Sequence, residues 1–121
     1  MTGMSLIAYV IDDDESVRKA FSRLLRSEHI EAKTFSSAEE FLKSDIRTEG
    51  ACIIADLRMP SITGVDLRAG MAAAGISIPI IVVSTLDTPE TRAEAKRLGA
   101  SAFFRKPVDD QALLDAIRWI V

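Results

Sequence analysis

The chain has 121 residues, 48% of them hydrophobic, and a formal net charge of −3. This composition suffices for one hydrophobic core, so one domain is expected over residues 1–121. The charge provides no cluster of lysines and arginines for a nucleic-acid backbone, which argues against direct DNA or RNA binding. The apolar runs fall short of the roughly 20 residues that cross a bilayer, and no secretion signal is visible. We therefore expect a cytoplasmic protein that does not enter the membrane.

Five short apolar runs are typical of β-strands. They lie at residues 6–11, 30–35, 51–55, 78–84 and 101–104. The first, third and fourth are almost continuously apolar, as are strands covered on both faces of a parallel sheet. The single cysteine, Cys52, lies inside the third run and is predicted to be a buried thiol.

Amphipathic stretches with a helical period separate these runs. The first helix, at residues 15–28, places Val17, Phe21, Leu24 and Leu25 on one stripe, which predicts a buried face. The second helix is expected to begin at Ser36 or Ser37, and the third to cover residues 65–74.

The last two helices have clear boundary signals. Thr88 followed by Pro89 predicts the start of the fourth helix, and Gly99 predicts its end. Asp109 precedes a final helix at residues 110–121. The core residues expected on this final helix are Leu113, Leu114, Ile117 and Ile120. Trp119 is also expected to pack against the protein, with a surface for a partner as the alternative.

Strand and helix alternate five times, which indicates parallel βαβ units. The predicted fold class is α/β, a doubly wound (βα)5 domain of the flavodoxin-like kind with a five-stranded parallel sheet. Among doubly wound strand orders, 2-1-3-4-5 suits a domain of this length, although the sequence does not show strand order directly. Ligands bind such sheets at the carboxyl ends of the strands, near the switch point in strand order.

Polar side chains follow four of the predicted strands. Asp12 and Asp13 follow the first, Asp56 follows the third, Ser84 ends the fourth, and Lys106 follows the fifth. Three carboxylates at one edge repel one another unless one is protonated or a cation compensates them. Oxygen ligands of this kind suit Mg²⁺, which predicts a magnesium site.

The same residues suit phosphoryl transfer. A carboxylate can act as the nucleophile and form an aspartyl phosphate, and Asp56 is the natural acceptor because Asp12 and Asp13 form a pair for the metal. Lys106 and the Ser84 hydroxyl can stabilise the charge that develops on the phosphoryl group. Taken singly, each residue is better explained as a helix cap, a turn residue or a solvated charge. The combination at four strand ends favours the functional interpretation.

Four segments carry a resemblance to a known family. They are VIDDDESVRKAFSRLL, IIADLRMPSITGVDL, IIVVST and GASAFFRKPVDDQALLDAI. Together they resemble the receiver domains of two-component response regulators, and most of all those of the FixJ type. The resemblance covers essentially the whole chain.

This resemblance implies a phosphorelay receiver that takes a phosphoryl group from a sensor histidine kinase and controls an output, expected to be transcriptional. It implies that Asp56 is the phosphorylation site, and that the Arg58 backbone carbonyl joins Asp12, Asp13 and Asp56 as a magnesium ligand. Ser84 and Phe103 match the switch residues of the family, although the sequence is equally compatible with Phe103 as an ordinary core residue. The changed surface would include the fourth helix, fifth strand and fifth helix, with a homodimer as one outcome of phosphorylation.

The Lys106–Pro107 bond resembles a cis peptide of the same family. Such a domain is not an enzyme in the ordinary sense, although it assists its own phosphorylation and dephosphorylation.

Three other functions compete with this interpretation. A phosphatase of the haloacid dehalogenase type also uses an aspartyl nucleophile, but it needs a second aspartate two residues later, where this chain has Arg58. A flavodoxin-like carrier of FMN needs backbone donors for a phosphate after the first strand, where Asp12 and Asp13 would repel it. A receiver-like module that no longer takes phosphate usually lacks an acidic residue or the lysine, and this chain retains them.

Overall fold

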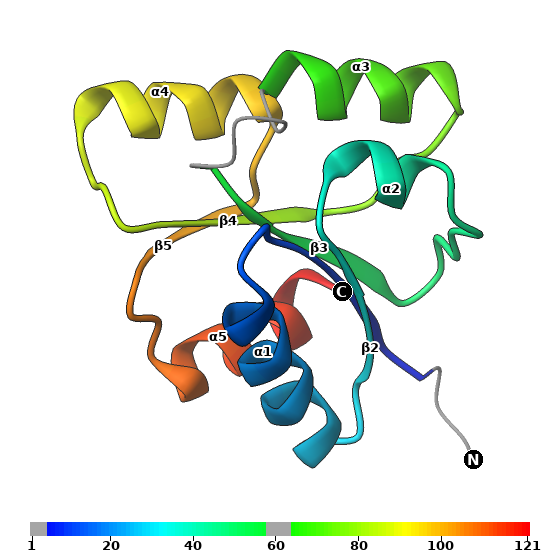
Figure 1. Cartoon of the computed structure of the whole chain (residues 1–121), viewed down its shortest axis with the longest axis vertical. Helices are drawn as coiled ribbons and strands as arrows, with labels where there is room; N and C mark the ends of the chain where they lie inside the picture. Colours follow the sequence, from blue (N-terminus) through cyan, green and yellow to red (C-terminus); the bar gives the residue numbers. More distant parts are fainter. Residues whose placement is uncertain (1–4, 58–63) are drawn as a thin grey trace.

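The computed structural model describes the backbone of residues 5–57 and 64–121, and the side chains of all these residues except 64–66. In the described part of the chain, five strands alternate with five helices (Figure 1). In chain order the elements are β1 (Ile7–Ile11), α1 (Glu15–Ser27), β2 (Glu31–Phe35), α2 (Ala38–Leu42), β3 (Ala51–Asp56), α3 (Gly64–Ala73), β4 (Ile80–Ser84), α4 (Pro89–Leu98), β5 (Ala102–Arg105) and α5 (Asp110–Ile120).

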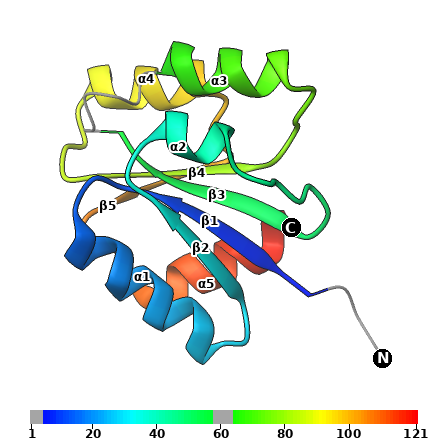
Figure 2. The ribbon, with the colours of Figure 1, turned by 45° about the vertical axis from the view of Figure 1, so that its right-hand side comes forward.

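The five strands form one parallel sheet in the order β2-β1-β3-β4-β5. This confirms the predicted fold class and strand order. Helices α1 and α5 cover one face of the sheet, and α2, α3 and α4 cover the other (Figures 1 and 2). Both faces of the central strands are therefore buried, which explains why their sequences are almost continuously apolar.

Alternate side chains of β1 enter two separate cores. Tyr9 packs in a cluster with Phe41 of α2 and Leu67 of α3. The neighbouring Val10 packs in a second cluster that includes Leu113 of α5. Successive side chains of a strand point to opposite faces, so a doubly covered sheet needs apolar residues at every position. Cys52 is buried in the second cluster, as predicted.

Capping residues mark where several helices begin and end. The Asp14 side chain caps α1, the Thr88 side chain caps α4, and the Asp109 side chain caps α5. Gly99 ends α4 with a φ of 83°, in the left-handed region that glycine adopts at low cost. The predicted start and end of α4 are thus confirmed, while α3 covers residues 64–73, one residue earlier than expected.

The prediction that Trp119 packs against the protein is wrong, because its side chain is 90% exposed. The buried residues of α5 are Leu113, Leu114 and Ile117. A residue two positions after Ile117 lies about 200° further around the helix, so Trp119 points away from the sheet. On α1 only Leu25 is fully buried, and Val17, Phe21 and Leu24 are partly buried. Of the helices in the described ranges, none is long and apolar enough to span a membrane.

Candidate functional site

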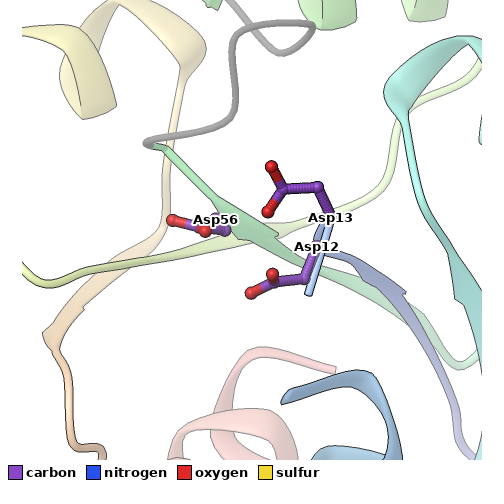
Figure 3. Close-up of side chains that lie close together, drawn as sticks. All are labelled: Asp12, Asp13 and Asp56. Atoms are coloured by element: carbon purple, nitrogen blue, oxygen red, sulfur yellow. The ribbon is translucent and has the colours of Figure 1, made fainter. Parts of the chain in front are cut away.

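Three aspartates meet at the carboxyl ends of β1 and β3. Ile11 pairs with Ala55 in the parallel ladder, so Asp12 and Asp56 are the next residues of adjacent strands. One carboxylate oxygen from each of Asp12, Asp13 and Asp56 lies within 4.8 Å of the others. Figure 3 shows the three side chains around a common space. The predicted crowding of carboxylates at this edge is therefore confirmed.

Burial differs among the three aspartates. Asp12 is 1% exposed and Asp56 is 6% exposed, whereas Asp13 is exposed to solvent. Ionised carboxylates that are buried this deeply need a compensating charge or hydrogen-bond donors. The cluster thus combines two buried carboxylates with a third that is exposed to solvent.

Lys106 supplies positive charge to this cluster. Its Nζ lies 2.9 Å from Asp12 Oδ2 and 3.3 Å from Asp56 Oδ2. Burial by itself lowers the pKa of Lys106, but the hydrogen bond to Asp12 and the charges of Asp56 and Asp12 outweigh it and raise the pKa above its ordinary value. The ammonium group is therefore held in its charged form beside both buried carboxylates. The Lys106–Pro107 peptide is cis, as expected from the resemblance.

The Ser84 hydroxyl lies at the end of β4, next to β3, the strand that carries Asp56. Val83 pairs with Asp56, and Ser84 itself is fully buried. The Oγ of Ser84 accepts a hydrogen bond of 3.0 Å from the backbone N–H of Leu86. The hydroxyl hydrogen can still donate, so Ser84 can act as a donor to a group on Asp56.

Two arginines that sequence reasoning missed support this edge. Arg18 of α1 donates from Nη1 to the backbone carbonyl of Asp12 at 2.7 Å. Arg92 of α4 places its guanidinium carbon 4.6 Å from the centre of the Phe103 ring. Neither arginine follows a strand, and surface arginines are common on amphipathic helices, so the sequence carried no signal that singled them out.

The backbone also positions the acidic pair. The N–H of Asp14 donates to Asp12 Oδ1 at 2.9 Å, and Asp14 in turn caps α1. Asp12 thus accepts from a backbone N–H with one carboxylate oxygen and from Lys106 with the other. Arg58, predicted to contribute a carbonyl ligand, lies outside the described residues.

The oxygen-rich cluster suits a hard divalent cation. Carboxylate oxygens are the protein ligands that Mg²⁺ prefers, and Mg²⁺ sites retain several water ligands. One exposed and two buried carboxylates on adjacent strand ends provide such ligands with an open side. A carboxylate beside a lysine and a buried hydroxyl is also suited to accepting a phosphoryl group.

Comparison with known proteins identifies the class. A family model described as the response regulator receiver domain matches residues 8–118. The chain therefore belongs to the receiver domains of response regulators, which are signalling domains. The predicted family is confirmed.

Transcriptional regulators are among the relatives of this chain. Transcriptional regulatory protein TdiR of Thauera aromatica is 36% identical over 116 residues, which cover 96% of this chain and 51% of that protein. Transcriptional regulatory protein FixJ of Azorhizobium caulinodans is 37% identical over 114 residues, which cover 94% of this chain and 54% of that protein. The chain thus spans about half the length of the curated relatives that it matches.

Solved structures agree with this assignment. The crystal structure of FixJ-N has a TM-score of 0.83 and 32% identity, with coverage of 96% of this chain and 93% of that chain. The chemotaxis protein CheY4 of Vibrio cholerae has a TM-score of 0.84 and 26% identity, with coverage of 98% of this chain and 100% of that chain. Both structures extend over nearly the whole receiver fold.

Proposed function

We propose that Asp56 accepts a phosphoryl group from a sensor histidine kinase, and that residues 1–121 form one receiver domain that acts in the cytoplasm. The observation that carries this proposal is the meeting of Asp12, Asp13 and Asp56 at one sheet edge, with Lys106 bonded to two of them. Relatives described as transcriptional regulators support a transcriptional output.

In the proposed reaction an Asp56 carboxylate oxygen attacks the phosphorus of a phosphohistidine. The new P–O bond forms as the P–N bond breaks, and the imidazole nitrogen leaves with the bonding electron pair. Lys106 places its charge beside the acceptor oxygen, and Ser84 presents a hydroxyl donor from the adjacent strand. Water later attacks the phosphorus, and the P–O bond to Asp56 breaks as the new P–O bond forms, which releases phosphate and restores the Asp56 carboxylate. We propose that the residues of the site assist this dephosphorylation.

Magnesium is the metal that we propose for the cluster. Asp12, Asp13 and Asp56 would hold it, with the Arg58 carbonyl as a fourth protein group implied by the family resemblance. A bound Mg²⁺ would neutralise negative charge on the phosphoryl oxygens. The oxygen-only ligand set fits this ion.

Phosphorylation is proposed to change the surface formed by α4, β5 and α5. The loop after Ser84 leads into α4, Phe103 lies within β5, and Lys106 lies between β5 and α5, so these three elements are connected directly to the site. A homodimer formed through this surface is one proposed outcome. Sedimentation with and without a beryllofluoride mimic of the phosphoryl group would detect it, and an unchanged monomer would argue against self-association.

Intact mass spectrometry after incubation with acetyl phosphate and Mg²⁺ tests the acceptor. We expect one added phosphoryl group on the wild type and none on Asp56→Asn. Asp115→Asn is the matched control, because Asp115 is an exposed aspartate on α5 whose carboxylate accepts a hydrogen bond from Gln111 of the same helix. Equal labelling of Asp56→Asn and the wild type would exclude Asp56 as the acceptor.

A further inference from the structure

The loop between β4 and α4 is held by consecutive contacts that begin at Ser84. The Leu86 N–H donates to Ser84 Oγ at 3.0 Å, and the Leu86 carbonyl accepts from Thr91 Oγ1 at 3.2 Å. The next residue, Asp87, pairs with Arg92 on the first turns of α4. Leu86 is thus tied to both the site and α4, and Asp87 is tied to α4.

Arg92 joins this loop to β5. Its Nε and Nη2 donate to the two carboxylate oxygens of Asp87 at 2.7 and 3.0 Å, a bidentate geometry that fixes the plane of the guanidinium. The same guanidinium lies over the Phe103 ring, with 4.6 Å between its carbon and the ring centre. One side chain therefore contacts both the loop after Ser84 and the partly buried aromatic residue of β5.

This series of contacts runs from Ser84 to Phe103, the two proposed switch residues. When the Ser84 Oγ atom itself moves toward a phosphoryl group on Asp56, the Leu86 N–H that donates to this oxygen follows it or loses its partner. Asp87 is the next residue, whereas Arg92 is anchored in α4, so movement of the loop separates the ion pair. Movement of the Phe103 ring likewise ends its contact with the guanidinium.

We propose that Arg92 is a positioning residue that holds the β4–α4 loop and Phe103 in their present arrangement, and so opposes the phosphoryl-bound arrangement of the site. This inference rests on the proposed function of Asp56 and Ser84. A side chain that stabilises one of two arrangements lowers the apparent affinity for any ligand that binds the other.

The local charges support a specific role for this pair. The hydrogen bond from Arg92 is the largest influence on the pKa of Asp87 and lowers it, with a smaller contribution in the same direction from the charge of Arg105. Arg92 combines this hydrogen bond with the contact to Phe103, so the loop and β5 are held by the same guanidinium.

The test is the apparent affinity for beryllofluoride in the presence of Mg²⁺, measured by titration of the whole chain. Arg92→Ala is expected to bind about threefold to tenfold more tightly than the wild type, because an exposed ion pair and an exposed cation–π contact each change an equilibrium by at most about fivefold. Arg92→Lys keeps the charge but loses the planar fork, so its affinity is expected to lie between those of the wild type and Arg92→Ala.

Arg97→Ala is the matched control. Arg97 lies on the same helix, is similarly exposed, and pairs with Glu94 of that helix instead of with the loop. Its affinity for beryllofluoride is expected to equal that of the wild type. Asp87→Ala should tighten binding, and Asp87→Ala combined with Arg92→Ala should bind no more tightly than Arg92→Ala alone, because the two residues form one contact.

The outcomes separate the two proposals. A wild type that does not bind beryllofluoride would remove the proposed function and this inference together. A wild type that binds while Arg92→Ala binds equally or more weakly would overturn the role of Arg92 alone. A lower melting temperature of Arg92→Ala without tighter binding would show a purely structural contribution and would also overturn it.

Discussion

Lys106 and Asp12 are 94 residues apart in the sequence, yet Lys106 Nζ donates a hydrogen bond of 2.9 Å to Asp12 Oδ2 in a partly buried ion pair. Their contact joins the ends of β1 and β5, the first and last strands along the chain. Removing one member of such a pair leaves the other charge desolvated, which costs more than the pair itself contributes. The lysine that is proposed to act in the site is therefore also expected to stabilise the fold.

The first prediction follows from this pair. Lys106→Met should lower the free energy of unfolding by about 1–3 kcal/mol without added metal, less than for a fully buried pair because the lysine retains some exposure. Lys43→Met is the control, since Lys43 forms an exposed pair with Glu39 on α2. Chemical denaturation of both variants measures the difference, and equal values would contradict the importance of the Lys106 contact.

The second prediction concerns metal binding. Thermal stability of the wild type should rise with added Mg²⁺, because a ligand that binds only the folded site stabilises it. Asp12→Ala should abolish the rise, since Asp12 is one of the three clustered carboxylates. Asp115→Ala, which changes an exposed carboxylate on α5, should keep it. Equal shifts in Asp12→Ala and the wild type would place the metal elsewhere.

The third prediction concerns the lifetime of the phosphoryl group. Hydrolysis needs a water in line with the P–O bond, and a polar side chain beside the site can orient that water. Leu86 follows Ser84 by two residues, is half exposed and has no polar group that could orient a water. We therefore expect slow loss of the phosphoryl group in the wild type and faster loss in Leu86→His.

Mass spectrometry over time after removal of acetyl phosphate measures both rates. Leu86→Met is the control, since it keeps an apolar side chain of similar volume and should lose the phosphoryl group at the wild-type rate. Loss within seconds from the wild type, or no acceleration in Leu86→His, would contradict this prediction.

The fourth prediction concerns Cys52 and pH. Burial raises the pKa of its thiol from 9.0 to about 12. The unfolded chain releases this proton near its ordinary pKa while the folded protein retains it, so stability is unaffected below that value and falls as the pH rises toward 12. The slope from this residue is at most about 1.4 kcal/mol per pH unit.

Cys52→Ala removes this titration. The difference in unfolding free energy between the wild type and Cys52→Ala should therefore be constant below about pH 8 and shrink or reverse at higher pH. Denaturation at a series of pH values tests it. A difference that does not change with pH would mean that the thiol ionises equally in the folded and unfolded states.

Much of the site could be predicted from local patterns. The end of each near-continuous apolar run predicted the end of a strand. The sequence therefore predicted correctly that the polar residues at these ends, such as Asp12 and Asp56, lie at one edge of the sheet. Cap residues such as Thr88 and Gly99 marked α4 in the same way. These signals are visible because the period of a strand or helix and the chemistry of a cap act over a few residues.

The exposure of Trp119 could have been predicted from its position on α5, but the size of its apolar side chain led to the opposite prediction. Its position relative to Ile117 on α5 already implied the exposed side of the helix, whereas its large apolar ring suggested packing. Helical geometry decided the outcome, because a side chain's direction is set by its place around the axis and not by its hydrophobicity.

The sequence by itself determined the alternation of strands and helices along the chain, the two-sided burial of the sheet and the polar residues at the strand ends. Only the tertiary structure decided that Lys106 bonds Asp12 and that Arg92 joins Asp87 to Phe103. These contacts depend on the register of strands and on how a helix lies against the sheet, which arise from packing between segments distant in the chain. No local period encodes such distances, so the partners of a long charged side chain appear only when the fold brings them together.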